Sequence, residues 1–269
     1  MRIVLLVPKI HGPAELAVNH LLSRKDLDIV GIVRSDISPF TTAYWKYLRF
    51  GVRKAGVFYG FLIGISFYWH LLGFAIAGLL FWNRRRKWRS LGELIERNGL
   101  LVHDTEDINS VKTLEVLKSW NIDVMASVYF DQILKKSVIE IPKVAALNMH
   151  PGLLPRYRGL WPEFWTMYHG EQYSGITIHH LNEAIDAGDV VAQSRFKIQR
   201  KESKLGLSLR GARYGAKLLT KVLLKLKRGL PLAAIKVKDK GKYFSLPDKK
   251  AFDQFFARGG RLLGWDGLW

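Results

Sequence analysis

AALNMHPGLLPRYRG, residues 145–159, is the stretch that decides the fold assignment. It continues an apolar run typical of a buried strand, Val144–Leu147, into a loop with two Pro and two Gly. Asn148 and His150 stand where the strand opens, and because side chains alternate along a strand, both point to one side. An uncharged amide donor beside a side chain that titrates near neutrality suits a reaction in which a carbonyl oxygen becomes negative. The alternative is a strand that ends in a turn with a structurally satisfied His.

A second informative stretch lies downstream, in SGITIHHLNEAIDAGDVV, residues 174–191. Its first half alternates apolar and polar residues around Ile176 and Ile178, which predicts a strand. The strand runs into a loop that carries Asp186-Ala187-Gly188-Asp189.

The two stretches together resemble a known enzyme family. N-x-H-P-G-L-L-P-x-Y-R-G, then G-x-T-x-H and D-x-G-D, is similar to the 10-formyltetrahydrofolate-dependent formyltransferases, which include glycinamide-ribonucleotide, methionyl-tRNA and amino-sugar formyltransferases. The resemblance is strong over Asn121–Ile198, weak over Met1–Ser35 and faint in the C-terminal segment. One departure is Gly152, where many members have Ser.

The resemblance implies roles for particular residues. Asn148, His150 and Asp186 match the catalytic trio, and 10-formyltetrahydrofolate is the implied formyl donor and co-substrate, with no metal. Arg156 and Arg158 are candidates for binding an acceptor phosphate, or they only cap the loop. The candidates for binding the folate donor are Tyr129, Phe130, Gln132, Ile133, Leu134, His180 and Asp189.

The N-terminal third has the pattern of an α/β protein. Arg2–Val7 and Asp28–Val33 read as buried strands around a helix at Ala14–Leu22, which predicts a Rossmann-like parallel sheet covered by helices. No G-x-G-x-x-G follows the first strand, so a dinucleotide site is not indicated. Further helices are expected at 91–98, 111–119 and 205–229, further strands at 100–103 and 121–130, and a small tail at 235–237, 243–245 and 252–256.

An uncharged segment interrupts this pattern. Ala55–Asn83 contains no Asp, Glu, Lys or Arg, and basic residues flank it on both sides, so it is long enough to be a transmembrane candidate. A single crossing would separate strands that must pair in one sheet. We therefore expect an apolar helical hairpin that inserts into one leaflet, the alternatives being a buried helix pair or a dimer contact.

These observations divide the chain. Residues 1–204 form the expected formyltransferase domain, interrupted at 40–90 by the membrane-docking insertion, and residues 205–269 form a helix with a small α+β tail. The tail is too short for the C-terminal barrel domain expected of a methionyl-tRNA formyltransferase.

Composition narrows the partners. A formal net charge of +19 with a pI of about 10.1 favours an anionic partner, such as an anionic membrane surface, a phosphorylated substrate or nucleic acid. The chain has no Cys, which excludes disulfides and thiolate metal sites, and its eight His form no helical ligand pair. We expect a cytoplasmic protein held peripherally or monotopically on the inner membrane face. The sequence does not decide between a monomer and a homodimer.

Three functions compete at this point. The first is an N-formyltransferase that acts on an amino sugar or a lipid-linked amine. The second is a tRNA-directed formyltransferase, which the charge suits and the short tail does not, so nucleic acid is the less favoured partner. The third is a non-catalytic membrane-docking protein, which the intact trio argues against.

Overall fold

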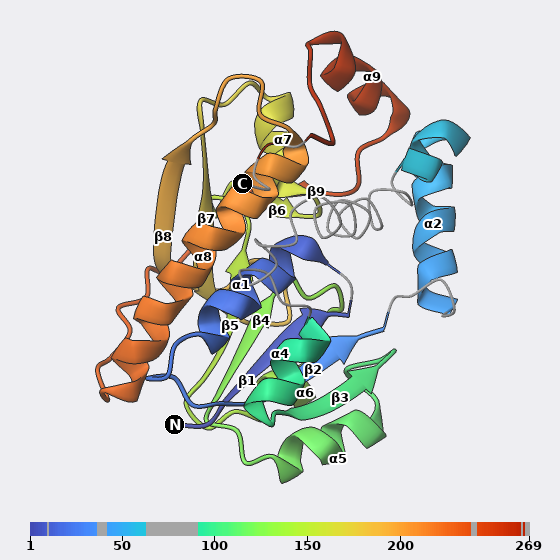
Figure 1. Cartoon of the computed structure of the whole chain (residues 1–269). Helices are drawn as coiled ribbons and strands as arrows, with labels where there is room; N and C mark the ends of the chain where they lie inside the picture. Colours follow the sequence, from blue (N-terminus) through green and yellow to red (C-terminus); the bar gives the residue numbers. More distant parts are fainter. Residues whose placement is uncertain (10, 37–41, 63–90, 238–240, 265, 267–269) are drawn as a thin grey trace.

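The computed structural model describes residues 1–9, 11–36, 42–62, 91–237, 241–264 and 266. Its centre is a seven-stranded sheet in the order β3-β2-β1-β4-β5-β7-β8 (Figure 1). The strands are β1 Ile3–Pro8, β2 Ile29–Ser35, β3 Leu101–Thr105, β4 Val124–Val128, β5 Ala145–His150, β7 Tyr173–His180 and β8 Val190–Lys197.

The first five strands form the parallel part of the sheet. β1 pairs with β2 and β4, β2 pairs with β3, and β4 pairs with β5, all parallel. All six residues of β1 are buried, as expected for a strand covered on both faces. The predicted α/β architecture with a parallel sheet is confirmed for these strands.

Of the remaining two strands, only β7 runs in the opposite sense. β7 pairs antiparallel with β5, and β8 pairs antiparallel with β7. β8 therefore has the direction of the first five strands, and the predicted parallel sheet is interrupted near this edge by the antiparallel strand β7. The chain returns from β5 through a loop and the helix α7, Pro162–Tyr168, and enters the sheet from the opposite end.

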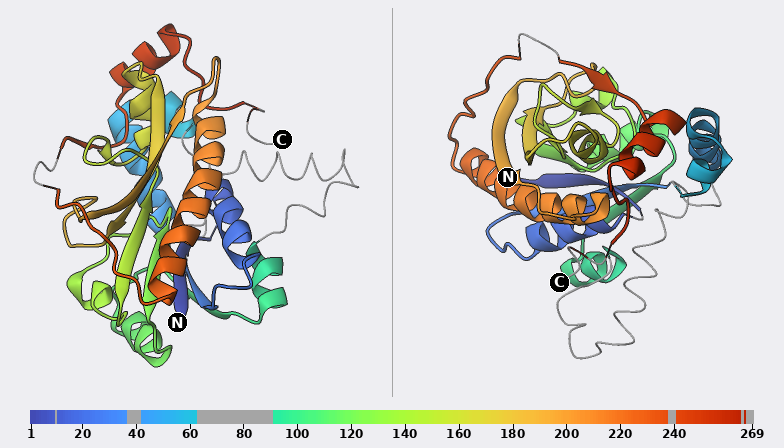
Figure 2. Two further views of the ribbon diagram at one scale, coloured as in Figure 1. Left: turned by 90° about the vertical axis from the view of Figure 1, so that its left-hand side faces the viewer. Right: turned by 90° about the horizontal axis from the view of Figure 1, so that it is seen from above.

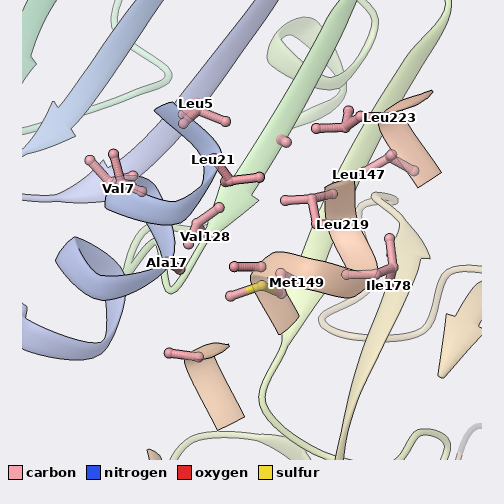
Figure 3. Packing of buried hydrophobic residues seen from close by; sticks show 14 of the residues in the cluster. Leu5, Val7, Ala17, Leu21, Val128, Leu147, Met149, Ile178, Leu219 and Leu223 are labelled. Carbon is pink, nitrogen blue, oxygen red and sulfur yellow. The ribbon is translucent and has the colours of Figure 1, made fainter. Parts of the chain in front are cut away.

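Helices cover both faces of the sheet (Figure 2). On one face, α1 Gly12–Leu22, α4 Leu91–Asn98 and α8 Lys204–Lys227 pack on alternate strand residues such as Leu5, Leu147 and Met149 (Figure 3). On the other face, α5 Val111–Ser119 and α6 Lys136–Ile139 cover Val4, Leu6 and Met125. α8 shares the main core with the sheet, and its inward side carries the buried residues Leu205, Leu209, Ala212, Ala216, Leu219 and Leu223.

A third, aromatic cluster stands beyond the sheet. α7 packs on α9, Lys249–Ala257, through Phe164, Phe252 and Phe255, and α2, Thr42–Ala55, joins them. α2 and α7 were not expected from the sequence. In the tail, β9 Tyr243–Phe244 pairs with β6 Arg158–Gly159, whereas the strand expected at 235–237 is a single bridge between Ile235 and Val190.

The predicted apolar hairpin lies mostly outside the described residues. Its first part, residues 57–62, is helical and follows α2 after Gly56. In the portion of the chain that the structure describes, no helix has both the length and the apolar character to cross a membrane.

Candidate active site

Asn148, His150 and Asp186 come together at the carboxyl end of β5. Asn148 is paired across the sheet with His179 of β7, and His150 is paired with Thr177, so these four side chains share one face. Val128 at the end of β4 is paired with Met149, which puts the segment from Tyr129 onward beside the same edge. The carboxyl edge of a parallel sheet is where open α/β folds bind ligands.

Asp186 is the hub of the cluster. Its Oδ2 accepts the backbone N–H of Gly159 at 2.9 Å and lies 3.4 Å from His150 Nδ1. Its Oδ1 accepts Asn148 Nδ2 at 3.3 Å and lies 3.6 Å from His179 Nε2. The side chain keeps only 11% of its surface exposed, so Gly159 N–H, Asn148 and His150 replace most of its hydration.

The contacts of His150 assign its protonation state. Nε2 lies 2.8 Å from the carbonyl oxygen of Tyr157, which only accepts, so Nε2 carries a hydrogen. Nδ1 faces the Asp186 carboxylate, which would repel a bare lone pair. His150 is therefore an imidazolium in this arrangement. Burial opposes this charge, but Asp186 outweighs it and raises the pKa of His150 above its ordinary value.

Asp186 shows the complementary shift. Burial alone would raise the pKa of the carboxyl, but the positive charge of His150 and its hydrogen bond to the carboxylate hold that pKa well below its usual range. The two side chains thus form a buried ion pair beneath Asn148.

His179 is a fourth member that the sequence analysis did not select. Its Nδ1 donates to the carbonyl of His180 at 2.8 Å, so Nε2 is left to accept Asn148 Nδ2 at 3.1 Å. Both amide hydrogens of Asn148 are then held inside the cluster. The sequence motif G-x-T-x-H does contain His179, but the sequence analysis selected the neighbouring His180 as a site residue.

The neighbouring loops are held by specific contacts. Thr177 Oγ1 donates to Gly152 O at 2.7 Å and accepts Leu154 N at 3.1 Å, while Gln193 binds both Thr177 and Leu154. A Cβ on Gly152 would stand 2.9 Å from His150 Nε2. The imidazole ring in its present position therefore leaves no room for the Ser that many family members have at this residue. A Cβ on Gly188 would stand 1.7 Å from the carbonyl oxygen of His180, so the D-x-G loop approaches β7 as only Gly allows.

The candidate donor-binding segment uses most of its side chains internally. Gln132 accepts Ile108 N and donates to Thr105 O, while Phe130 and Leu134 pack in the core below α5. Ile133 stays 62% exposed. This arrangement leaves the backbone of residues 129–134 as the part that can meet a ligand, and their role stays a prediction.

The other two donor-binding candidates lie apart from the trio. His180 is paired with Leu147, a core residue, and so shares the face opposite to His179. Burial lowers the pKa of His180, which the nearby Asp189 partly opposes. Asp189 O accepts the N–H of His180 at 3.0 Å. Their assignment to donor binding also stays a prediction.

The two arginines differ in their surroundings. Arg156 keeps 74% of its side chain exposed and reaches Glu171 at 3.2 Å. Arg158 donates through Nε and an Nη to the carbonyl of Ile185, at 3.0 and 2.6 Å, and so holds the loop just before Asp186. Arg158 therefore holds the loop that leads into Asp186, as in the capping alternative, and its role in binding an acceptor stays a prediction.

A buried polar link lies at the base of the site. The Tyr129 hydroxyl donates to Ser208 O at 3.2 Å, and Ser208 Oγ donates to Glu163 Oε1 at 2.7 Å. Glu163 is 5% exposed, and its negative charge adds to the rise in the pKa of His150. This link joins β4, α7 and α8 around the carboxyl edge.

The sequence is similar to known formyltransferases over this region. A model of the family described as Formyl transferase matches residues 95–223. The methionyl-tRNA formyltransferase of Ehrlichia ruminantium (strain Welgevonden) is 33% identical over 138 residues, which cover 51% of this chain and 46% of that protein. The chain thus spans about half the length of the curated relatives it matches.

The fold is similar to solved structures over a longer range. Glycinamide ribonucleotide transformylase 1 from Symbiobacterium toebii superposes with a TM-score of 0.58 at 14% identity, covering 88% of this chain and 94% of that one. An N-formyltransferase from Helicobacter canadensis, solved with folinic acid and dTDP-3-aminofucose, superposes with a TM-score of 0.56 at 17% identity, covering 93% and 72%. At such identities the likeness concerns the fold.

Proposed function

We propose that this chain is a member of the formyl transferase family that moves a formyl group from 10-formyltetrahydrofolate to a primary amine. The observation that carries this proposal is the cluster of Asn148 and the His150–Asp186 ion pair at the carboxyl edge of the sheet. An amide donor beside a fixed positive charge suits an acyl carbon that becomes tetrahedral.

In the proposed reaction the amine nitrogen attacks the formyl carbon, and the carbonyl electron pair moves to oxygen. Asn148 offers the donor for this oxyanion by giving up its 3.3 Å contact with Asp186. His150 supplies positive charge from below, since both of its ring nitrogens already face acceptors. The bond to the donor nitrogen then breaks, its electron pair stays on that nitrogen, and a proton lost by the amine restores the neutral donor. Asp186 orients His150, or accepts that proton through a water.

The donor is proposed to lie against residues 129–134. Its support is the backbone of this loop at the carboxyl edge, with the exposed apolar side chain of Ile133 beside it. Folinic acid, a formylated folate, is named for the Helicobacter canadensis structure. His180 and Asp189 complete the proposed donor site as in the sequence-based prediction.

For the acceptor we favour an amino sugar or a lipid-linked amine handled at the cytoplasmic membrane face. The support is the acceptor named for the Helicobacter canadensis enzyme, a nucleotide-linked amino sugar, and the apolar run at Ala55–Asn83 with its basic flanks. A methionyl-tRNA acceptor is the second candidate, because curated relatives carry that name and the net charge is +19.

Two measurements test the proposal. Purified protein with 10-formyltetrahydrofolate should consume the donor only when an acceptor is added, and extracts of lipids and nucleotide sugars should contain a formylated amine that is lost with the gene. Formylation of initiator methionyl-tRNA would reverse the choice of acceptor. Donor consumption in no acceptor fraction would contradict the proposed function itself.

A further inference from the structure

The outer face of α2 and residues 57–62 combines large apolar side chains with positive charge. Trp45 is 53% exposed and Phe50 41%. After the turn at Gly56, Val57 is 76% exposed, Phe58 67% and Phe61 63%. We call these five apolar residues, with Lys46, Arg49, Arg53 and Lys54, the α2 face.

The pattern along the helix separates this face from a packed one. The exposed residues of α2 recur at intervals of four, at 45–46, 49–50 and 53–54, and so lie along one side. Tyr44, Gly51 and Ala55 are buried on the other side. Tyr59 stacks on Phe252 of α9 at 4.6 Å and donates to Asp253, which fixes the segment after Gly56 to the aromatic cluster. The exposed side of α2 therefore points away from the side that is packed in the protein.

Its charge has one sign. The sequence contains no Asp or Glu between Asp36 and Glu93. All four basic side chains of the α2 face are exposed. Within the described part of the chain, none of the four forms an ion pair with a carboxylate. The four positive charges are thus available to an anionic surface.

We infer that the α2 face is a docking surface for an anionic lipid bilayer, with Val57, Phe58 and Phe61 entering the acyl boundary and the four cations at headgroup level. Aromatic residues beside Lys and Arg on one helical face are the composition of interfacial membrane helices. A nucleic acid would use the charges but would leave the aliphatic and aromatic cluster of residues 57–61 exposed. This inference specifies the surface behind the proposed membrane association, and it does not depend on formyl transfer.

The position of the α2 face relates it to the candidate active site. α2 follows β2, whose carboxyl end lies at the same edge of the sheet as the ends of β4 and β5 (Figure 1). α9 connects α2 to α7, and α7 follows the loop that carries Tyr157 and Gly159. Docking through the α2 face would therefore bring the catalytic edge toward the bilayer, where a lipid-linked amine is presented.

The test is sedimentation of the full-length protein with vesicles of phosphatidylcholine alone or with phosphatidylglycerol. Wild type should bind the anionic vesicles. Combined Arg49→Gln, Arg53→Gln and Lys54→Gln should lower the partition coefficient roughly 100-fold, because each cation near an anionic surface contributes about fivefold. Combined Phe58→Ser and Phe61→Ser should weaken binding to both vesicle types.

A matched variant controls for net charge. Combined Lys217→Gln, Lys221→Gln and Lys225→Gln removes the same charge from the exposed side of α8 and should change the partition coefficient much less. Equal loss in both triple variants, or unchanged binding of the α2 variants, would overturn the inference while leaving membrane association intact. Absence of wild-type binding would overturn both. Transfer to a soluble amine, measured in parallel, reports on the proposed enzyme activity separately.

Discussion

Asp186→Asn removes one charge of a buried ion pair while keeping the shape of the side chain. The new amide can still accept from Gly159 N through its oxygen, but its NH₂ group then faces the NH₂ group of Asn148, which already donates to His179. His150 loses the carboxylate that offsets its burial, so its pKa should fall below the ordinary value of about 6.5. The variant therefore trades an ion pair for a neutral, poorly matched cluster.

The loss of unfolding free energy follows from the hydrogen bonds that the charged carboxylate of Asp186 no longer accepts. A charged hydrogen bond contributes about 1.5–3 kcal/mol, and His150 can shed its proton instead of remaining buried and charged, so we expect a loss of about 2–3 kcal/mol near pH 6. Wild-type stabilisation from His150 is fully present below the unfolded-state pKa and is lost as pH rises through the raised folded-state pKa. Stabilisation from Asp186 is present above its unfolded-state pKa and is lost as pH falls through the depressed folded-state pKa.

The difference in unfolding free energy between wild type and Asp186→Asn should thus be largest at about pH 5–6 and should shrink toward about pH 9. Urea unfolding across this range measures it, and Asp26→Asn, which removes an exposed carboxylate paired with Arg24, is the control that should show no such profile. A difference that is constant with pH would refute the assignment of His150 as a buried cation.

Three further substitutions examine the loops around the trio. Gly188→Ala puts a Cβ against the His180 carbonyl, so it should displace Asp186 with a loss of turnover on the order of 100-fold and should also lower the unfolding free energy. His179→Phe removes the acceptor for Asn148 and should lower kcat roughly tenfold with little change in KM; an unchanged kcat would show that His179 does not position Asn148. Arg158→Lys removes the fork onto Ile185 O and should lower kcat for all acceptors alike, whereas a KM increase confined to phosphorylated acceptors would assign Arg158 to substrate binding.

The sequence predicted the parts of the fold whose signals are local. β1, α1 and β2 follow from one apolar run, one amphipathic stretch and a second apolar run, and the bounds of α4 and α5 match their predicted ranges. The reversed direction of β7 carries no local signal, because an alternating apolar pattern is the same for a strand that enters the sheet from either end. α2 and α7 were missed because aromatic residues weaken the helical pattern of both segments, and α2 also contains Gly51.

The site was predictable where a motif identified particular residues. Asn148 and His150 share a face by strand alternation, and Asp186 was placed with them by resemblance; the structure brings all three within contact. The sequence-based selection did not include His179, because its place beside Asn148 is visible only from the pairing of β5 with β7. The side chains of Gln132 and Arg158 form hydrogen bonds with the backbone of Ile108 and Ile185. These partners are remote in sequence, so no local sequence pattern predicts the contacts.

The most direct test of the central claim is transfer of an isotopically labelled formyl group. Labelled 10-formyltetrahydrofolate should pass its label to an amine in the presence of wild type, with the product identified by mass spectrometry. Asn148→Ala and His150→Ala should each reduce the rate by on the order of 100-fold or more while circular dichroism shows an intact fold. Transfer at the wild-type rate in both variants would contradict the account, because the cluster at the carboxyl edge of the sheet would then not carry the chemistry.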